Sequence, residues 1–188
     1  MNAKSRIYNI PNLITSFRFF LAGVLMILLM LEQNVGIALT SWAVFFLAAT
    51  SDWVDGYFAR RYQSVTVLGK LMDPLADKVL VATALIMLIP SGKLPAWMVL
   101  LILAREIVIT GLRSVASTSG IVVAASTLGK FKSITQYIGL GFLIFPLGVL
   151  PFPVHKIGLI IMYFALFITL WSGGDYFYKL RRIFLEDN

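Results

Sequence analysis

The sequence predicts an all-α integral membrane protein, a bundle of six transmembrane helices with both termini in the cytoplasm. Hydrophobic residues make up 59% of the 188 residues and charged residues 13%, which is more apolar side chain than one soluble core of this size encloses. Clusters of Pro, Gly and charge divide the chain into six apolar stretches, each close to the roughly 20 residues that cross a hydrocarbon core. Because lipid cannot satisfy unpaired backbone groups, every span is expected to be helical.

The expected spans cover residues 12–31, 36–61, 71–89, 95–117, 132–150 and 155–180. The first follows the basic start "MNAKSRIYNIPN" and has no small-residue cleavage site, so we expect a retained span rather than a signal peptide. The segments "EQNVG", "IPSGKLP" and "LPFP" interrupt the apolar pattern and set three of the boundaries. With no internal repeat, residues 1–188 are expected to form a single domain.

The basic residues determine the expected orientation. All but two of those near the span ends fall on one side of the six-span arrangement, which the positive-inside rule places in the cytoplasm of a multi-pass cell-membrane protein. They are Lys4, Arg6, Arg60, Arg61, Lys70, Lys130, Lys132, Lys179, Arg181 and Arg182, with Lys93 and Lys156 on the other side. A net charge of +7 spread among spans indicates contact with anionic lipid or phosphate, and no nucleic-acid partner is expected.

Four aspartates lie close together in this apolar chain. Asp52 and Asp55 are three residues apart late in the second span, and Asp73 and Asp77 are four apart at the start of the third. At about 100° per residue each pair shares one helix face, and the short segment "YQSVTVLGK" would bring the pairs opposite one another. Four like charges repel unless some are protonated or cations hold them.

The residue types around the aspartates indicate which cation. The chain has no cysteine and one histidine, so the ligands would be oxygen atoms, which favour Mg²⁺ or Mn²⁺. Two such ions can clamp a phosphate under attack. The structural alternative is that an aspartate near a helix end caps it, and Asp73 followed by Pro74 fits that role. Capping is a weaker explanation for four aspartates on two neighbouring helices.

The spacing of these residues resembles the signature of the CDP-alcohol phosphatidyltransferase family in every position. The eight matching residues span 26 positions: Asp52, Asp55, Gly56, Ala59, Arg60, Gly69, Asp73 and Asp77. Gly56 and Ala59 would leave room for a nucleotide beside the first pair, although small residues at this spacing also serve helix packing. Gly69 is expected to permit a tight turn between the two helices.

The resemblance implies a transfer reaction in a membrane-embedded homodimer. Members of the family move a phosphatidyl group from CDP-diacylglycerol to an alcohol and release CMP. By matching position, Asp52, Asp55, Asp73 and Asp77 would bind two Mg²⁺ or Mn²⁺ ions per site on the cytoplasmic side. Asp77 would also be the catalytic general base that takes the proton of the alcohol.

A further set of residues is expected to bind CDP-diacylglycerol. Asn12 and Thr15 share one side of the first span with Arg18, and this polar side should face away from lipid. Asn12 could instead cap the helix. The expected set for CDP-diacylglycerol is Asn12, Thr15, Asp52, Gly56, Ala59, Arg60, Thr66 and Lys70.

Other motifs concern the acceptor alcohol. The segments "PNLITSFR", "AREIVITGLR" and "GKFKSITQ" resemble the phosphatidylglycerophosphate synthase branch of the family, whose acceptor is glycerol 3-phosphate. Basic side chains near a dimetal site suit an acceptor that carries a phosphate, although basic residues near span ends also snorkel to the interface. The expected acceptor-binding residues are Arg18, Arg105, Arg113 and Lys130. Direct displacement is expected because the motif supplies no nucleophile with its own base.

Two alternatives stay open at this point. The same aspartates would serve another acceptor, such as inositol phosphate, serine, choline or phosphatidylglycerol. Outside the enzyme class, intramembrane carboxylates occur in cation transporters, but these distribute acids along a path through the bilayer. Here the acids gather near one face, on either side of the segment from Arg60 to Lys70, which favours the transferase.

Overall fold

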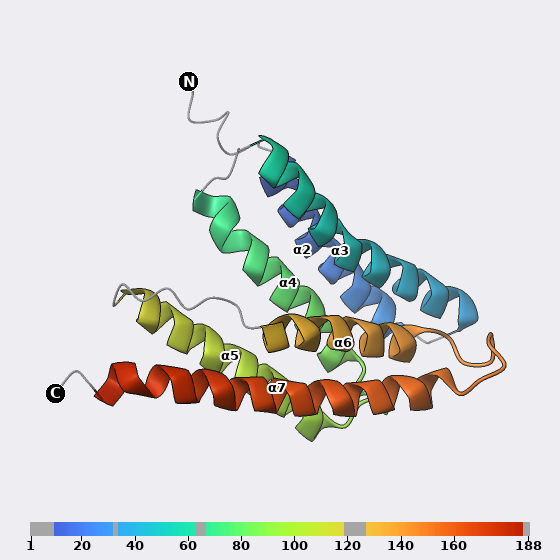
Figure 1. Ribbon diagram of the computed structural model, residues 1–188. Coiled ribbons are helices and arrows are strands. Elements are labelled where there is room, and N and C mark those ends of the chain that lie inside the picture. The colour runs from blue at the N-terminus through green and yellow to red at the C-terminus, as the bar shows by residue number, and fades with distance from the viewer. Residues whose placement is uncertain (1–9, 32–33, 63–66, 119–126, 186–188) are drawn as a thin grey trace.

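The computed structural model describes residues 10–31, 34–62, 67–118 and 127–185, and in this part of the chain it contains six α-helices and no strand (Figure 1). This confirms the all-α expectation. The side chains at 10–14, 52–62, 67–71, 73, 74, 117, 118, 127, 179, 180 and 182–185 lie outside the described set. The helices are α2 (Ile10–Met30), α3 (Val35–Tyr62), α4 (Val67–Met87), α5 (Ala96–Thr118), α6 (Thr127–Ile144) and α7 (Val154–Leu185).

The helices pack as two neighbouring groups. α2 contacts α3 and α4, while α7 contacts α5 and α6, and α6 joins the groups by contacting α3 and α4. Figure 1 shows the end of α3 and the start of α4 at the same end of the bundle as the start of α2. The backbone segments that carry the aspartate motif therefore lie toward the same end of the bundle.

A continuous apolar core runs through both groups. Leu25 of α2, Leu80 of α4, Met98 and Ile102 of α5 and Leu140 of α6 all have no exposed surface. Burial of this kind stabilises a fold by about 1.5–3 kcal/mol for each large apolar side chain in water. Within a bilayer, close packing rather than the hydrophobic effect must hold the helices together.

Two glycines allow α6 and α7 to approach closely. A Cβ atom at Gly139 of α6 would come within 2.8 Å of the sulfur of Met162. On α7, a Cβ atom at Gly158 would come within 2.9 Å of the Cβ of Phe142 and 3.1 Å of the backbone nitrogen of Leu143. Neither position accommodates a side chain without movement of its neighbours, so these glycines are packing residues.

The outer surface of the bundle is apolar. Ile107 of α5 is 73% exposed, and Phe164, Phe167 and Trp171 of α7 are 58%, 60% and 64% exposed. Soluble monomers rarely expose contiguous apolar patches of this kind. Among the described residues, Val154–Tyr178 is long and apolar enough to cross a membrane, and Thr15–Met30 and Val35–Ser51 are shorter apolar segments. Six complete spans therefore stay a prediction.

Three local expectations were wrong. The fifth helix does not cover 132–150: it runs from Thr127 to Ile144, because Pro146 disfavours helical backbone at the residue before it. Gly69 does not form a turn, since α4 already begins at Val67. For the same reason Asp73 lies inside α4 and is no N-cap, and Pro74 sits within the helix at the cost of one intrahelical hydrogen bond.

Candidate active site

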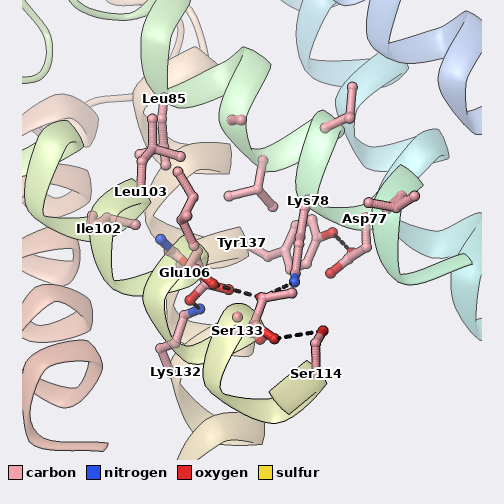
Figure 2. Close-up of a pocket in the computed structure, with 18 residues that line it drawn as sticks. Asp77, Lys78, Leu85, Ile102, Leu103, Glu106, Ser114, Lys132, Ser133 and Tyr137 are labelled. Atoms are coloured by element: carbon pink, nitrogen blue, oxygen red, sulfur yellow. Dashed lines mark hydrogen bonds and ion pairs between the residues drawn. The ribbon is translucent and has the colours of Figure 1, made fainter. Parts of the chain in front are cut away.

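Asp77 lies on the wall of a cavity of about 630 Å³ between α4, α5 and α6 (Figure 2). Most of the lining is apolar, as in typical small-molecule sites, and the volume is within their usual range. The polar members come from all three helices: Asp77, Lys78, Glu106, Thr110, Ser114, Lys132, Ser133, Gln136 and Tyr137. The expected general base therefore faces a space large enough for part of a substrate.

The carboxylate of Asp77 has a partner on another helix. The hydroxyl group of Tyr137, on α6, donates a hydrogen bond to Oδ1 of Asp77 (Figure 2). The same ring packs against Phe45 of α3, with ring centroids 5.8 Å apart. One side chain thus connects α3, α4 and α6 at the position of the expected base.

The residue after Asp77 links α4 to α5. The ammonium group of Lys78 donates a hydrogen bond to Oγ1 of Thr110, and Thr110 in turn donates to the backbone oxygen of Glu106 at 2.6 Å. Lys78 therefore places a positive charge on the cavity wall beside Asp77. The position of the Lys78 ammonium group therefore depends on α5.

A buried ion cluster forms the other polar side of the cavity. Oε1 of Glu106 accepts from Nζ of Lys132 on α6 and from Nη1 of Arg105, the latter at 2.9 Å. The side chain of Lys132 is 6% exposed and that of Glu106 is 23% exposed. Burying charges is costly unless they are paired, so the three side chains stabilise one another only as a set.

Arg105 also holds α5 to α7. Its Nε donates to the backbone oxygen of Thr169 at 3.1 Å, and its Nη2 donates to Oγ of Ser172 at 2.8 Å. Gly173 makes room for this side chain, because a Cβ atom there would lie 3.2 Å from Cγ of Arg105. The guanidinium group points into the bundle, so the snorkelling alternative does not describe Arg105.

Arg113 contacts a different part of α7. Its Nη2 donates to the hydroxyl of Tyr176, and the guanidinium carbon lies 4.8 Å from the centre of the Tyr176 ring. Nε of Arg113 is buried and has no hydrogen-bond partner among the described residues. Neither Arg105 nor Arg113 lines the cavity, although Glu106 connects Arg105 to it.

Lys130 does not join this cluster. Its side chain is exposed on α6, and the described part of the chain contains no hydrogen bond or ion pair between Lys130 and either arginine. Lys132, two residues later, is the lysine that lies between the cavity and Glu106. The structure therefore brings Arg105 and Lys132 together and leaves Arg113 and Lys130 apart.

The polar side of the first helix is buried, as expected. Thr15 and Arg18 of α2 are each 1% exposed. Nε of Arg18 lies 3.4 Å from Oγ of Ser51, the residue that precedes Asp52 on α3. Arg18 is therefore positioned beside the start of the aspartate motif.

Most of the motif lies outside the described side chains. Thr66 is outside the described residues altogether. For the other members the structure gives the helix but no side-chain position: Asn12 on α2, Asp52, Asp55, Gly56, Ala59 and Arg60 on α3, and Lys70 and Asp73 on α4. Asp73 and Asp77 occupy one continuous helix, which agrees with their expected shared face.

The donor set is compatible with a hard divalent cation. Within the described side chains no three His, Cys, Asp or Glu residues come together, since Asp77 is the one motif aspartate among them. Its carboxylate faces a cavity, and the neighbouring backbone segments of α3 and α4 carry the other three. Carboxylate oxygens without nitrogen or sulfur ligands suit Mg²⁺ or Mn²⁺.

Some residues of this site were missed or undervalued in the sequence. Tyr137 is followed by the apolar second half of α6, and a tyrosine in such a position is usually interfacial or packed. Gln136 is 2% exposed, lines the cavity, and its Nε2 has no hydrogen-bond partner in the described part of the chain. A signal existed for both, because "KSITQY" places polar side chains at 132, 133 and 136 on one face of α6, and Tyr137 follows Ser133 by four residues on that face.

Several known proteins are similar to this chain over nearly its full length. A Bacillus subtilis CDP-diacylglycerol–glycerol-3-phosphate 3-phosphatidyltransferase is 40% identical over 186 residues, which cover 92% of this chain and 95% of the relative. The protein of the same name from Rickettsia bellii is 36% identical and covers 94% of this chain and 97% of its own. That from Salmonella choleraesuis is 34% identical, with 95% and 98% covered.

The family profile described as CDP-alcohol phosphatidyltransferase matches residues 8–171. This range includes all four motif aspartates, the cavity between α4, α5 and α6, and the cluster around Glu106. Because the profile matches most of its length and the relatives above are 34–40% identical to it, this chain belongs to the CDP-alcohol phosphatidyltransferase family.

Proposed function

We propose that the protein transfers the phosphatidyl group of CDP-diacylglycerol to glycerol 3-phosphate, giving phosphatidylglycerophosphate and CMP. The observation that carries the proposal is the position of Asp77 on a cavity that also contains Lys132, Lys78 and the amide of Gln136. This cavity pairs a base with positive charge, which a phosphorylated alcohol requires. The names of relatives at 34–40% identity support the same acceptor.

The apolar exterior supports a location in the cell membrane. Side chains such as Ile107, Phe164 and Phe167 would contact lipid tails. The protein would span the membrane several times as a homodimer, with both termini and the aspartates on the cytoplasmic side, where the basic residues gather. The water-soluble acceptor would then reach the site from the cytoplasm while the lipid substrate enters from the bilayer.

Asp52, Asp55, Asp73 and Asp77 would hold two divalent cations. Bound there, Mg²⁺ or Mn²⁺ would neutralise the charge of the pyrophosphate and of the departing CMP. Small residues beside the first pair, Gly56 and Ala59, would leave space for the nucleotide. Asn12, Thr15, Arg60, Thr66 and Lys70 complete the proposed CDP-diacylglycerol site.

In the proposed chemical step, Asp77 accepts the proton of the attacking hydroxyl group. A hydroxyl oxygen of glycerol 3-phosphate forms a bond to the phosphorus that carries diacylglycerol, and the bond from that phosphorus to the bridging oxygen of CMP breaks. The hydroxyl proton passes to the carboxylate of Asp77, and the electron pair of the broken bond leaves with CMP. A positioned base of this kind contributes roughly 10²–10⁴-fold to a rate.

The acceptor phosphate would be bound by the cations of α2, α5 and α6. Arg18, Arg105, Arg113 and Lys130 form the set proposed from the sequence, and Lys132 joins it because it lines the cavity with Asp77. Nε of Arg113, buried without a described partner, is a donor for a phosphate oxygen. The acceptor would lie in the cavity beside Asp77 and Lys132. Glu106 connects Arg105 to this cavity, whereas Arg113 and Lys130 do not line it.

An acceptor competition tests the proposal. Purified protein in detergent with Mg²⁺ and labelled CDP-diacylglycerol is given glycerol 3-phosphate, inositol phosphate, serine or phosphatidylglycerol, each alone and then together. We expect lipid product with glycerol 3-phosphate and at least tenfold less with each alternative. Serine and phosphatidylglycerol lack a terminal phosphate group, and inositol phosphate holds its phosphate at a different distance from the reacting hydroxyl. Product from another acceptor in preference to glycerol 3-phosphate would reassign the substrate within the family.

A further inference from the structure

We propose that Tyr137 is a positioning residue for the active site: its hydroxyl group fixes the carboxylate of Asp77 in the orientation that binds the divalent cation and receives the proton. The inference rests on the proposed function and adds a residue that the aspartate signature does not contain. The observation behind it is the hydrogen bond from Tyr137 of α6 to Oδ1 of Asp77 of α4, 60 residues apart in the chain (Figure 2).

The ring of Tyr137 packs against the apolar core of the bundle. It packs against Phe45, which is 3% exposed. The residue lines the cavity of Asp77 and also a second, apolar cavity of about 650 Å³ between α3 and α6, lined by residues such as Phe46 and Ile138. The hydroxyl is the single polar group on a ring held between these two spaces.

The hydrogen bond restricts what Asp77 can do with its two oxygens. A carboxylate has about four acceptor positions, and the Tyr137 hydroxyl uses one of them on Oδ1. A hydrogen bond at Oδ1 favours one orientation of the carboxylate plane and so sets the direction of Oδ2. Groups that hydrogen-bond a metal-ligating carboxylate fix its orientation, and their loss commonly costs about 10–100-fold in metal affinity or activity.

A purely structural role is the competing explanation. A buried tyrosine hydroxyl needs a hydrogen-bond partner, and Asp77 could simply be the nearest acceptor. In that case removal of the hydroxyl would change stability but not cation affinity. The two explanations therefore differ in a quantity that can be measured without substrate.

The experiment compares Mn²⁺ binding by the purified parent protein and Tyr137→Phe in detergent, from the electron paramagnetic resonance signal of unbound Mn²⁺. The substitution keeps the ring and its contact with Phe45. We expect the Mn²⁺ dissociation constant to rise about tenfold, with no change in the number of ions bound. In the transfer assay kcat should fall about tenfold while KM for glycerol 3-phosphate stays within twofold.

Two controls complete the design. Tyr163→Phe removes the same atom from a ring on α7 that packs against Trp97 at 6.1 Å, and it should leave Mn²⁺ binding and kcat unchanged. Asp77→Asn should weaken Mn²⁺ binding by itself, and adding Tyr137→Phe to it should have no further effect, because the two residues act as a unit.

A Mn²⁺ dissociation constant for Tyr137→Phe within twofold of the parent would overturn the proposal, as would fully additive effects of the two substitutions. Because Mn²⁺ binding is measured without acceptor, these outcomes are separate from the question of which alcohol is used. A parent protein that binds Mn²⁺ through Asp77 but transfers nothing to glycerol 3-phosphate would contradict the proposed function and leave the role of Tyr137 intact.

Discussion

Substitution of Asp77 is expected to lower the turnover rate more than any other single substitution. It combines a position on the cavity wall with membership of the aspartate motif, and its partner Tyr137 belongs to another helix. We predict that Asp77→Asn lowers kcat about a thousandfold, because an amide neither accepts the alcohol proton nor ligates a cation as a carboxylate does. Labelled glycerol 3-phosphate incorporation into lipid measures this. Turnover within tenfold of the parent would remove Asp77 as the base.

Arg113 is expected to act on acceptor affinity. Arg113→Lys keeps the charge but loses the planar group that lies over Tyr176 and the buried Nε donor. We predict a KM for glycerol 3-phosphate about tenfold higher, with KM for CDP-diacylglycerol unchanged. Steady-state kinetics with each substrate varied in turn gives both values.

Tyr176→Phe is the matched control for Arg113. It removes the hydroxyl that accepts from Arg113 and keeps the ring beneath the guanidinium group. KM for glycerol 3-phosphate should rise by less than in Arg113→Lys. An equal rise in the KM of both substrates for Arg113→Lys would indicate a general disturbance of α5 rather than loss of an acceptor contact.

At the scale of the elements, Glu106 joins three helices. On α5, its carboxylate accepts hydrogen bonds from Lys132 of α6 and from Arg105. Arg105 in turn donates a hydrogen bond to Ser172 of α7. We predict that Glu106→Ala lowers the unfolding free energy by about 2 kcal/mol, because it leaves Lys132 buried without its counter-ion; the partial exposure of Glu106 keeps the cost below that of a fully buried pair. A thermal midpoint in detergent about 5 °C lower would follow.

Glu106→Gln separates charge from packing. The amide keeps the volume and one hydrogen-bond acceptor. The thermal midpoint of Glu106→Gln should therefore fall between those of the parent and Glu106→Ala. A Glu106→Ala midpoint equal to that of the parent would mean that the cluster contributes no stability to the contact between α5, α6 and α7.

The contact of α6 with α7 gives a second prediction at this scale. Gly158→Ala should destabilise the protein by about 1–2 kcal/mol, because the new Cβ would meet Phe142 and the backbone of Leu143 at 2.9 and 3.1 Å. Gly174→Ala, on the same helix, meets nothing within 4 Å and should be neutral or stabilising, since alanine favours helix. Thermal unfolding of both variants checks the difference in sign.

The elements also show how far the sequence could be interpreted. Apolar length and Pro or Gly punctuation predicted six helices and most of their positions, because these features act locally. The start of α4 at Val67 and the end of α6 at Ile144 were missed, since helix ends depend on packing that a hydropathy pattern does not contain. The sequence predicts a turn at Gly69 and offers an N-cap at Asp73 as an alternative, but both residues lie within α4.

For the site, the sequence predicted burial better than contacts. Spacing identified Asp77 and the buried polar face of α2 with Thr15 and Arg18. It could not predict that Tyr137 reaches Asp77, or that Lys132 rather than Lys130 joins Glu106. These pairs are separated by 60 and 26 residues, and such contacts depend on how whole helices are arranged.

At the scale of the whole molecule, we propose that α3, α4 and their neighbours form one cytoplasmic site where glycerol 3-phosphate displaces CMP directly. The most direct test follows labelled CMP release and labelled glycerol 3-phosphate incorporation in the same vesicles with Mg²⁺. We predict that the two amounts are equal throughout the reaction and that no CMP appears before glycerol 3-phosphate is added. Release of one CMP per active site in the absence of glycerol 3-phosphate would instead show a covalent intermediate and contradict the direct displacement.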